Sequence, residues 1–216
     1  LTLPVRAYPL TGFIMEKSVF DISFQQESVS NKIVVGLERI SEVFRTLLWA
    51  EAKKAGVSPI QIQILIFVAY HKSSLCTVSY LAKEFDVTKP TISDAVKSLK
   101  QKKLILKDYS NSDSRSYLIA LSEKGKQLVS VTENYANPLK KQFDTFDAAQ
   151  LETVYETIVK LIYNLNKAGI ISVQRMCFAC KFHTKQAGGD YCEYLQKPLK
   201  TEAIRVDCPE FEEKPN

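Results

Sequence analysis

The stretch TVSYLAKEFDVTKPTISDAVKSLKQKKLILKDYSNSDSRSYLIALSEKG, residues 77–125, decides the fold. Its first part, residues 78–85, has apolar positions at helical spacing, which predicts a short helix that ends in a tight turn at residues 85–87. Thr88 can cap a second helix because its hydroxyl can accept a hydrogen bond from a free N–H group, and Pro90 is tolerated in the first turn. Helix, short turn and helix is the helix-turn-helix arrangement.

The second helix is expected to run from Lys89 to about residue 102 and to have two different faces. Apolar residues recur with helical spacing at Ile92, Val96 and Leu99, so this face should pack on the preceding helix. The opposite face carries small hydroxyls and lysine, which can reach base edges or phosphates of DNA. The residues of this helix that we expect to contact DNA are Lys89, Pro90, Thr91, Ser93, Lys97, Ser98 and Gln101.

A two-stranded wing is expected to follow the second helix. Residues 104–109 and 116–121 are β-prone runs, and the segment between them is rich in turn-forming residues. Arg115, near the tip of this hairpin, is placed to enter a narrow minor groove of DNA. Asp113 can pair with its guanidinium group and fix its direction. The sequence therefore predicts a winged helix-turn-helix in a mainly α-helical chain.

Lysines are concentrated around the second helix. Between residues 83 and 107 there are seven lysines and three acids, an excess of four positive charges that suits contact with phosphates. The whole chain is only modestly basic, with a net charge of +5 and a pI near 8.8, which would not identify a polyanionic partner by itself. The alternative is a winged helix that serves as a protein-interaction module, with the lysines forming an ordinary solvated face.

The order of these elements resembles the MarR (multiple antibiotic resistance regulator) family over about residues 31–167. The family's Asp-x-Arg pair in the wing corresponds to Asp113 and Arg115. Its Leu-Thr-x-x-Gly motif, which opens the next helix, corresponds to residues 121–125, with Ser122 in place of Thr. Either hydroxyl can cap a helix, so the resemblance survives the exchange.

The resemblance implies a homodimer that binds double-stranded DNA. In the family, the N- and C-terminal helices of two subunits intertwine, and the two recognition helices address two half-sites of a palindromic operator. It implies further that the protein is a repressor, whose occupancy of the operator excludes polymerase. A small aromatic effector would bind between the dimer helices and the winged domain, where Trp49, Phe67 and Tyr70 can line a cleft. Ordinary core packing explains these three aromatics equally well.

The flanking regions are expected to be helical. Apolar residues repeat at helical spacing from 31 to 55, and Ser58 and Pro59 can open a further helix. A stripe from residue 128 to residue 146 predicts a helix that bends at Pro138. Asp147 can cap a final helix whose apolar face is wider than one neighbour requires, which implies a partner surface. A thicker core within one subunit is the alternative.

Four of the five cysteines lie in the last part of the chain, at Cys177, Cys180, Cys192 and Cys208. This tail is under fifty residues long with little periodicity, so a cross-link would help it to fold. The four thiols can ligate Zn²⁺, with His183 as a substitute ligand, or they can hold an iron–sulfur cluster. Disulfides are less favoured because nothing in the sequence points to secretion. Metal-free redox thiols and inert cysteines remain as alternatives.

At 216 residues with 45% hydrophobic content, the chain can bury a substantial core. No segment has the apolar length of a membrane span and no signal core is evident, so we expect a cytoplasmic protein that does not engage a membrane. The residues before Met15 are expected to be a misassigned start or a weakly ordered arm. The expected divisions are an arm at 1–30, a dimerisation helix at 31–56, the winged helix-turn-helix at 57–123, dimerisation helices at 124–168 and the cysteine tail at 169–216.

Three functional hypotheses follow. The first is a MarR-type DNA-binding regulator with a four-cysteine metal site. The second is a regulator of the same type in which an iron–sulfur cluster or redox-active thiols act as the sensor. The third is a metal-stapled adaptor that binds a protein partner. An enzyme has little support, because the chain shows no Gly-rich phosphate loop or catalytic triad pattern. Cys76 is expected to be a buried filler, with a peroxide-sensing thiol as the alternative.

Overall fold

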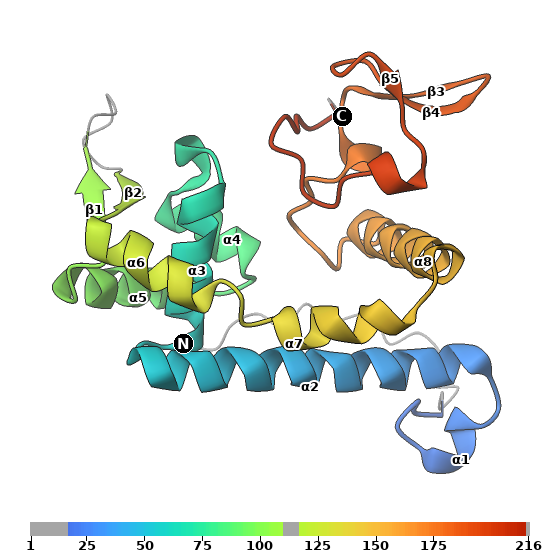
Figure 1. Ribbon diagram of the computed structural model, residues 1–216, viewed down its shortest axis with the longest axis horizontal. Helices are drawn as coiled ribbons and strands as arrows, with labels where there is room; N and C mark the ends of the chain where they lie inside the picture. Colours follow the sequence, from blue (N-terminus) through green and yellow to red (C-terminus); the bar gives the residue numbers. More distant parts are fainter. Residues whose placement is uncertain (1–16, 110–116, 215–216) are drawn as a thin grey trace, which may run out of the picture. The chain divides into compact units, whose positions relative to one another are not determined.

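The computed structural model describes residues 17–109 and 117–214 (Figure 1). It divides into two units, Leu1–Leu47 and Leu48–Asn216, and the division falls inside the long helix α2 (Val29–Ala55). In the first unit, α2 follows a short helix α1 (Ile22–Gln25), which Asp21 caps by accepting hydrogen bonds from two backbone N–H groups. The described part of the expected N-terminal arm therefore contains a helical turn.

The winged helix-turn-helix predicted from the sequence is confirmed in the second unit. Thr88 Oγ1 accepts a hydrogen bond from the backbone N–H of Thr91 at 3.3 Å, as its capping role requires. Gln61 Oε1 accepts a hydrogen bond from the backbone N–H of Ser58 at 3.0 Å, as part of the capping box that opens the helix at residues 59–70. The elements are α3 (Pro59–Tyr70), α4 (Val78–Glu84), α5 (Lys89–Gln101), β1 (Ile105–Asp108), β2 (Leu118–Leu121) and α6 (Glu123–Thr132).

One apolar core holds these elements together. Burial of aliphatic side chains contributes about 1.5–3 kcal/mol each, so this cluster is the main source of stability for the winged domain. The antiparallel pairing of β1 with β2 sets Ile105 opposite Leu121. The largest fully buried members of the core are Ile64, Leu65, Leu81, Ile92, Val96, Leu99, Ile105 and Ile119.

The predicted continuous helix with a bend at Pro138 is wrong. Helix α6 ends at Thr132, turns follow, and the chain then forms α7 (Asn137–Lys140) and a 3₁₀ helix (Lys141–Thr145). Pro138 lies in the first turn of α7, where its missing N–H group leaves no hydrogen bond unmade. The apolar periodicity was the same for one helix or two, so it did not reveal the break.

Helix α8 (Ala148–Lys167) begins as the sequence predicts. Asp147 Oδ1 accepts a hydrogen bond from the backbone N–H of Gln150 at 2.8 Å, and Gln150 Oε1 accepts one from the backbone N–H of Asp147 at 3.0 Å. These reciprocal bonds form a capping box. No helix among residues 17–109 and 117–214 is both long and apolar enough to cross a membrane.

The cysteine tail has regular structure that the sequence did not indicate. Its antiparallel sheet has the order β3-β4-β5, and two 3₁₀ helices, Cys177–Ala179 and Thr201–Ala203, flank it. The tail packs on α8 through Val159, Met176 and Ile204, and Tyr155 donates a hydrogen bond from its hydroxyl to the carbonyl oxygen of Ile204 at 2.5 Å. The strands are β3 (His183–Gln186), β4 (Gly189–Cys192) and β5 (Lys197–Pro198).

Candidate functional site

The exposed face of α5 carries the residues expected to contact DNA. Its apolar face is held in the core by Ile92 and Leu99, which are fully buried, so the orientation of the exposed face is fixed. Ser98 is half-buried, and the hydroxyl of Thr91 lies 2.8 Å from that of Thr88, so each is partly engaged within the protein. The exposed members of the set are Lys89, Pro90, Thr91, Ser93, Lys97 and Gln101.

The positive charge on α5 is available to a partner. Lys89, Lys97 and Lys100 are exposed, and among the described residues none of them forms a salt bridge. Lys102 differs, because its ammonium group donates to the carbonyl oxygen of Gly56. Lys107 lies over the ring of Tyr117, with its Nζ 3.8 Å from the ring centroid. The lysine excess counted in the sequence therefore overstates the charge that faces outward.

The expected minor-groove contact lies outside the described residues. Asp113 and Arg115 both belong to the segment 110–116, between β1 and β2, so their roles remain predictions from the sequence. The base of this wing is described, and its strands pair in register from Ile105 opposite Leu121 to Asp108 opposite Leu118.

The three aromatics proposed to line an effector cleft differ in their surroundings. Phe67 is buried in the core and stacks on His71, with ring centroids 3.8 Å apart. Trp49 and Tyr70 are largely exposed, and the Tyr70 hydroxyl donates to the carboxylate of Glu133. For Phe67, core packing therefore explains its position, which was the alternative to an effector cleft that the sequence left open.

Cys76 is the buried filler that the sequence predicts. Its side chain is 1% exposed, and burial raises the pKa of its thiol to about 11. Its sulfur lies 3.5 Å from the carbonyl oxygen of Lys72, which accepts a weak hydrogen bond from the thiol. A thiol with this pKa is protonated at neutral pH and is a poor nucleophile, which argues against peroxide sensing at this position.

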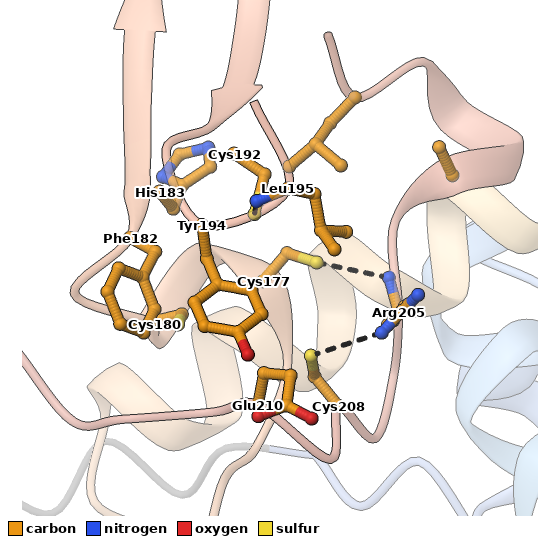
Figure 2. A pocket seen from close by; sticks show the side chains of 12 residues that line it. Cys177, Cys180, Phe182, His183, Cys192, Tyr194, Leu195, Arg205, Cys208 and Glu210 are labelled. Atoms are coloured by element: carbon orange, nitrogen blue, oxygen red, sulfur yellow. Dashed lines mark hydrogen bonds between the residues drawn. The ribbon is translucent and has the colours of Figure 1, made fainter. Parts of the chain in front are cut away.

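The four tail cysteines lie around one small cavity of about 20 Å³ (Figure 2). Cys177 opens a 3₁₀ helix and Cys180 follows its end, while Cys192 closes β4. Cys208 comes from the segment after the second 3₁₀ helix, so residues far apart in sequence meet here. All five cysteines of the chain are free thiols. As the side chains stand, no group of three or more His, Cys, Asp or Glu residues within 17–109 and 117–214 is set to hold a metal ion.

Hydrogen-bond donors surround the tail sulfurs. The backbone N–H of Arg205 donates to Cys177 Sγ at 3.2 Å, and its guanidinium Nη1 donates to Cys208 Sγ at 3.6 Å. The backbone N–H of Leu195 donates to Cys192 Sγ at 3.5 Å. Burial and the neighbouring thiols raise the pKa of Cys177, and the N–H of Arg205 partly offsets this. His183 borders the same cavity, but its Nε2 is 2.8 Å from Asp190 Oδ1.

A cluster around Arg175 joins the tail to the winged domain. Its guanidinium contacts both carboxylate oxygens of Glu84 on α4, at 2.5 and 3.0 Å, and both oxygens of Asp207, at 2.7 and 2.8 Å. His71 Nε2 lies 2.9 Å from Asp207. Burial alone would raise the pKa of Asp207, but hydrogen bonds from Arg175 and His71 bring it below its usual value. Sequence reasoning missed Arg175, because no local pattern marks a pair 91 residues apart.

Similarity to known proteins was found among solved structures, whereas no curated protein matches this chain. The S. aureus MepR–DNA complex aligns with 22% identity and a TM-score of 0.52, covering 60% of this chain and 94% of that one. A MarR/EmrR family regulator from Acinetobacter sp. ADP1 aligns with 21% identity and a TM-score of 0.53, covering 65% of this chain and 99% of that one. A MarR protein from Peptoclostridium difficile aligns with 16% identity and a TM-score of 0.56, covering 66% of this chain and 92% of that one.

These alignments establish a shared fold, and a third of this chain or more lies outside each of them. A family comparison adds that residues 55–115 match the MarR family. This range begins at the end of α2, includes α3, α4, α5 and β1, and extends into the wing. The helix-turn-helix geometry agrees with both comparisons: residues 55–115 match the MarR family, and the chain shares the winged helix-turn-helix fold of the aligned structures.

Proposed function

We propose that this protein is a DNA-binding transcriptional regulator that uses α5 to read duplex DNA. The observation that carries the proposal is the face of α5 on which exposed lysines and hydroxyl groups stand, on a helix fixed by the core. An α-helix fits the major groove of B-DNA, where hydroxyl and amide side chains can read base edges. A neighbour of the same fold, MepR from S. aureus, was solved as a DNA complex, which supports the same use of the fold here.

The residues of α5 divide into two roles. Lys89 and Lys97 would contact phosphates and set the position of the helix, aided by the positive end of the helix dipole near Thr88. Thr91, Ser93 and Gln101 would reach base edges and supply sequence preference. Occupancy of an operator by such a protein would exclude polymerase, so repression is the direction of regulation that we favour.

A homodimer would place two copies of α5 on the half-sites of a palindromic operator. In the first unit, α2 exposes a row of large apolar side chains that includes Leu37, Ile40 and Phe44. In the second unit, α8 exposes Ile158 and Leu161. Exposed apolar rows of this size are typical of surfaces that a partner covers, and a two-fold symmetric dimer is the commonest such assembly.

Duplex binding can be tested without knowledge of the operator. Sequences selected from a random duplex library would be labelled, and affinity would be followed by fluorescence anisotropy over a range of salt concentrations. Lys97→Ala should weaken binding and reduce the slope of log K against log salt by about two for a dimer that loses two phosphate contacts. Lys160→Ala on α8 removes the same charge away from α5 and serves as the matched control.

Two results would argue against the proposal that α5 reads duplex DNA. One is the absence of any selected sequence that binds better than the random pool. The other is an equal effect of Lys97→Ala and Lys160→Ala, which would show that only net charge matters. Binding that ignores salt would instead favour the adaptor hypothesis, because phosphate contacts release counterions and must respond to salt.

Dimerisation has its own test. Ile40→Glu puts a charge in the exposed apolar row of α2, and we expect it to convert a dimer into a monomer in light scattering after size exclusion. Thr46→Glu, at an exposed position of α2 away from that row, is the control and should remain dimeric. A wild-type protein that is monomeric at micromolar concentration would overturn the dimer proposal.

A further inference from the structure

We propose that Cys177, Cys180, Cys192 and Cys208 bind one Zn²⁺ ion in a closed site with four thiolate ligands. This inference concerns the tail and does not depend on DNA binding. Four soft sulfur donors without an aqueous position are the ligand set of structural zinc, which prefers tetrahedral coordination. Such a site stabilises a fold and carries no reaction.

The first argument is convergence. The four cysteines come from a 3₁₀ helix, the end of β4 and the C-terminal segment, and all border one cavity. Cys76, the fifth cysteine, packs in the core of the winged domain. Cys177 and Cys180 are buried and Cys192 and Cys208 are half-buried. Packing alone gains little from gathering four thiols at one place, whereas a shared cation would account for their common location.

The second argument is size. The cavity holds about 20 Å³, and a volume of about 10–15 Å³ accommodates a single water-sized guest. A single ion therefore suits the space better than a four-iron cluster with its bridging sulfides. The size of the cavity therefore favours zinc over the cluster that the sequence left open.

The third argument is the arrangement of donors around the sulfurs. The N–H group of Arg205 and that of Leu195 donate to Cys177 and Cys192, and the Arg205 guanidinium donates to Cys208. N–H donors that surround the ligands orient them and spread the negative charge of a metal-bound thiolate. The guanidinium also offsets part of the net negative charge that four thiolates and one Zn²⁺ would have.

Binding requires the sulfurs to turn. Figure 2 shows the sulfur atoms of Cys177 and Cys208 directed toward Arg205, which agrees with the lack of a preset ligand group in the described part of the chain. A cysteine has one side-chain torsion, and its staggered positions differ little in energy. The Nε2 atom of His183 is already engaged by Asp190, so the fourth ligand is assigned to a thiol.

The ion would join segments that a small apolar cluster holds only in part. The buried members of that cluster are few, and a domain of this size gains most from a cross-link. Cys208 follows Asp207 directly, so coordination of its sulfur would also hold Asp207 in place beside Arg175. Zinc would thus stabilise both the tail and its attachment to α4.

The experiment begins with metal analysis of the full-length protein purified without oxygen. We expect about one zinc per chain and no visible absorption. Cys180→Ser and Cys192→Ser should each lose the metal, while Cys76→Ser and His183→Ala should retain it. Substitution by Co²⁺ should give the visible bands of tetrahedral cobalt with sulfur-to-metal charge transfer.

A second measurement protects the test against variants that do not fold. In the wild-type protein, a chelator that removes zinc should expose four additional thiols to a thiol reagent under native conditions. Brown protein that contains iron and sulfide would overturn the zinc assignment. Wild-type protein that binds neither Zn²⁺ nor Co²⁺ would overturn the site itself. Loss of zinc from His183→Ala together with its retention in Cys192→Ser would overturn the ligand set.

Discussion

The guanidinium of Arg175 and the carboxylate of Glu84 form a bidentate ion pair, with N–O distances of 2.5 and 3.0 Å. Glu84 is the last residue of α4, and Arg175 stands at the start of the tail. The same guanidinium binds Asp207, so one arginine pairs with two carboxylates from separate parts of the chain. The Arg175 side chain is 11% exposed, which reduces screening by solvent and strengthens the pairing.

Removal of the Arg175 side chain should therefore destabilise the folded protein. Arg175→Ala removes the cation that Glu84 and Asp207 share and leaves Asp207 with His71 alone. We expect the free energy of unfolding to fall by about 3 kcal/mol, a loss that the partial exposure of Asp207 moderates. Equilibrium unfolding in denaturant would measure this loss of stability. Lys72→Ala removes an exposed pair with Glu210 nearby and should cost less than about 1 kcal/mol. Equal losses in the two variants would contradict the structural role of Arg175.

Gly125 is required by a close approach of backbone. A Cβ atom at this position of α6 would lie 2.0 Å from the carbonyl oxygen of Leu104, so helix and strand would have to separate. We expect Gly125→Ala to destabilise the protein by about 3 kcal/mol in thermal or denaturant unfolding. Gly188→Ala is the matched control, because no neighbouring atom of the described residues lies within 4 Å of its Cβ position. A Gly125→Ala variant as stable as this control would show that α6 packs differently.

Cys76 should resist thiol reagents in the folded protein. Its pKa is raised to about 11 by burial, so the thiolate fraction at pH 8 is on the order of one in a thousand. A thiol reagent should modify Cys76 slowly in the folded protein, and the rate should rise about tenfold for each unit of pH. After unfolding, modification should be complete. Peptide mass spectrometry measures the extent of labelling. Rapid labelling of Cys76 at pH 7 would revive the redox-sensor hypothesis for this residue.

Substitutions at two neighbouring residues of α8 should affect different contacts, one with the tail and one with a partner subunit. Val159 is buried against the tail, whereas Ile158 is 39% exposed on another face of the helix. Val159→Asp should release the tail and increase its cleavage by protease, because a buried unpaired charge is unfavourable. Ile158→Asp should leave the tail protected and weaken a dimer that uses the exposed face.

The protease pattern and the oligomeric state separate these two effects. A tail that is cleaved equally in both variants would show that α8 has one continuous apolar face. A wild-type tail that is already cleaved as fast as in Val159→Asp would show that the packing of the tail on α8 is weak. Either result would change the assignment of the α8 surface.

The winged helix-turn-helix could be predicted because its signals are local. Thr88 and Pro90 mark the start of α5, and the spacing of Ile92, Val96 and Leu99 defines its buried face. The capping box of α8 at Asp147 follows from residues three positions apart in the same way. Helix starts and apolar periodicity depend on neighbouring residues, which a sequence contains in full.

The break before Pro138 and the sheet of the tail could not be predicted. An apolar stripe has the same period on one long helix or on two short ones, so only packing decides where α6 ends. The strands of the tail are short, and β5 has two residues, which gives too little pattern to recognise. Part of the apolar face of α8 that suggested a partner subunit is covered by the tail.

By itself, the sequence determined the helix-turn-helix, its exposed basic face and the presence of four cysteines in the tail. Only the tertiary structure decided that these four thiols share one small cavity and that Arg175 binds Glu84 and Asp207 together. The physical reason is the distance along the chain over which the interactions act. Caps, turns and helical faces arise from interactions over a few residues, whereas a cavity or a buried ion pair depends on which distant segments the apolar core brings into contact.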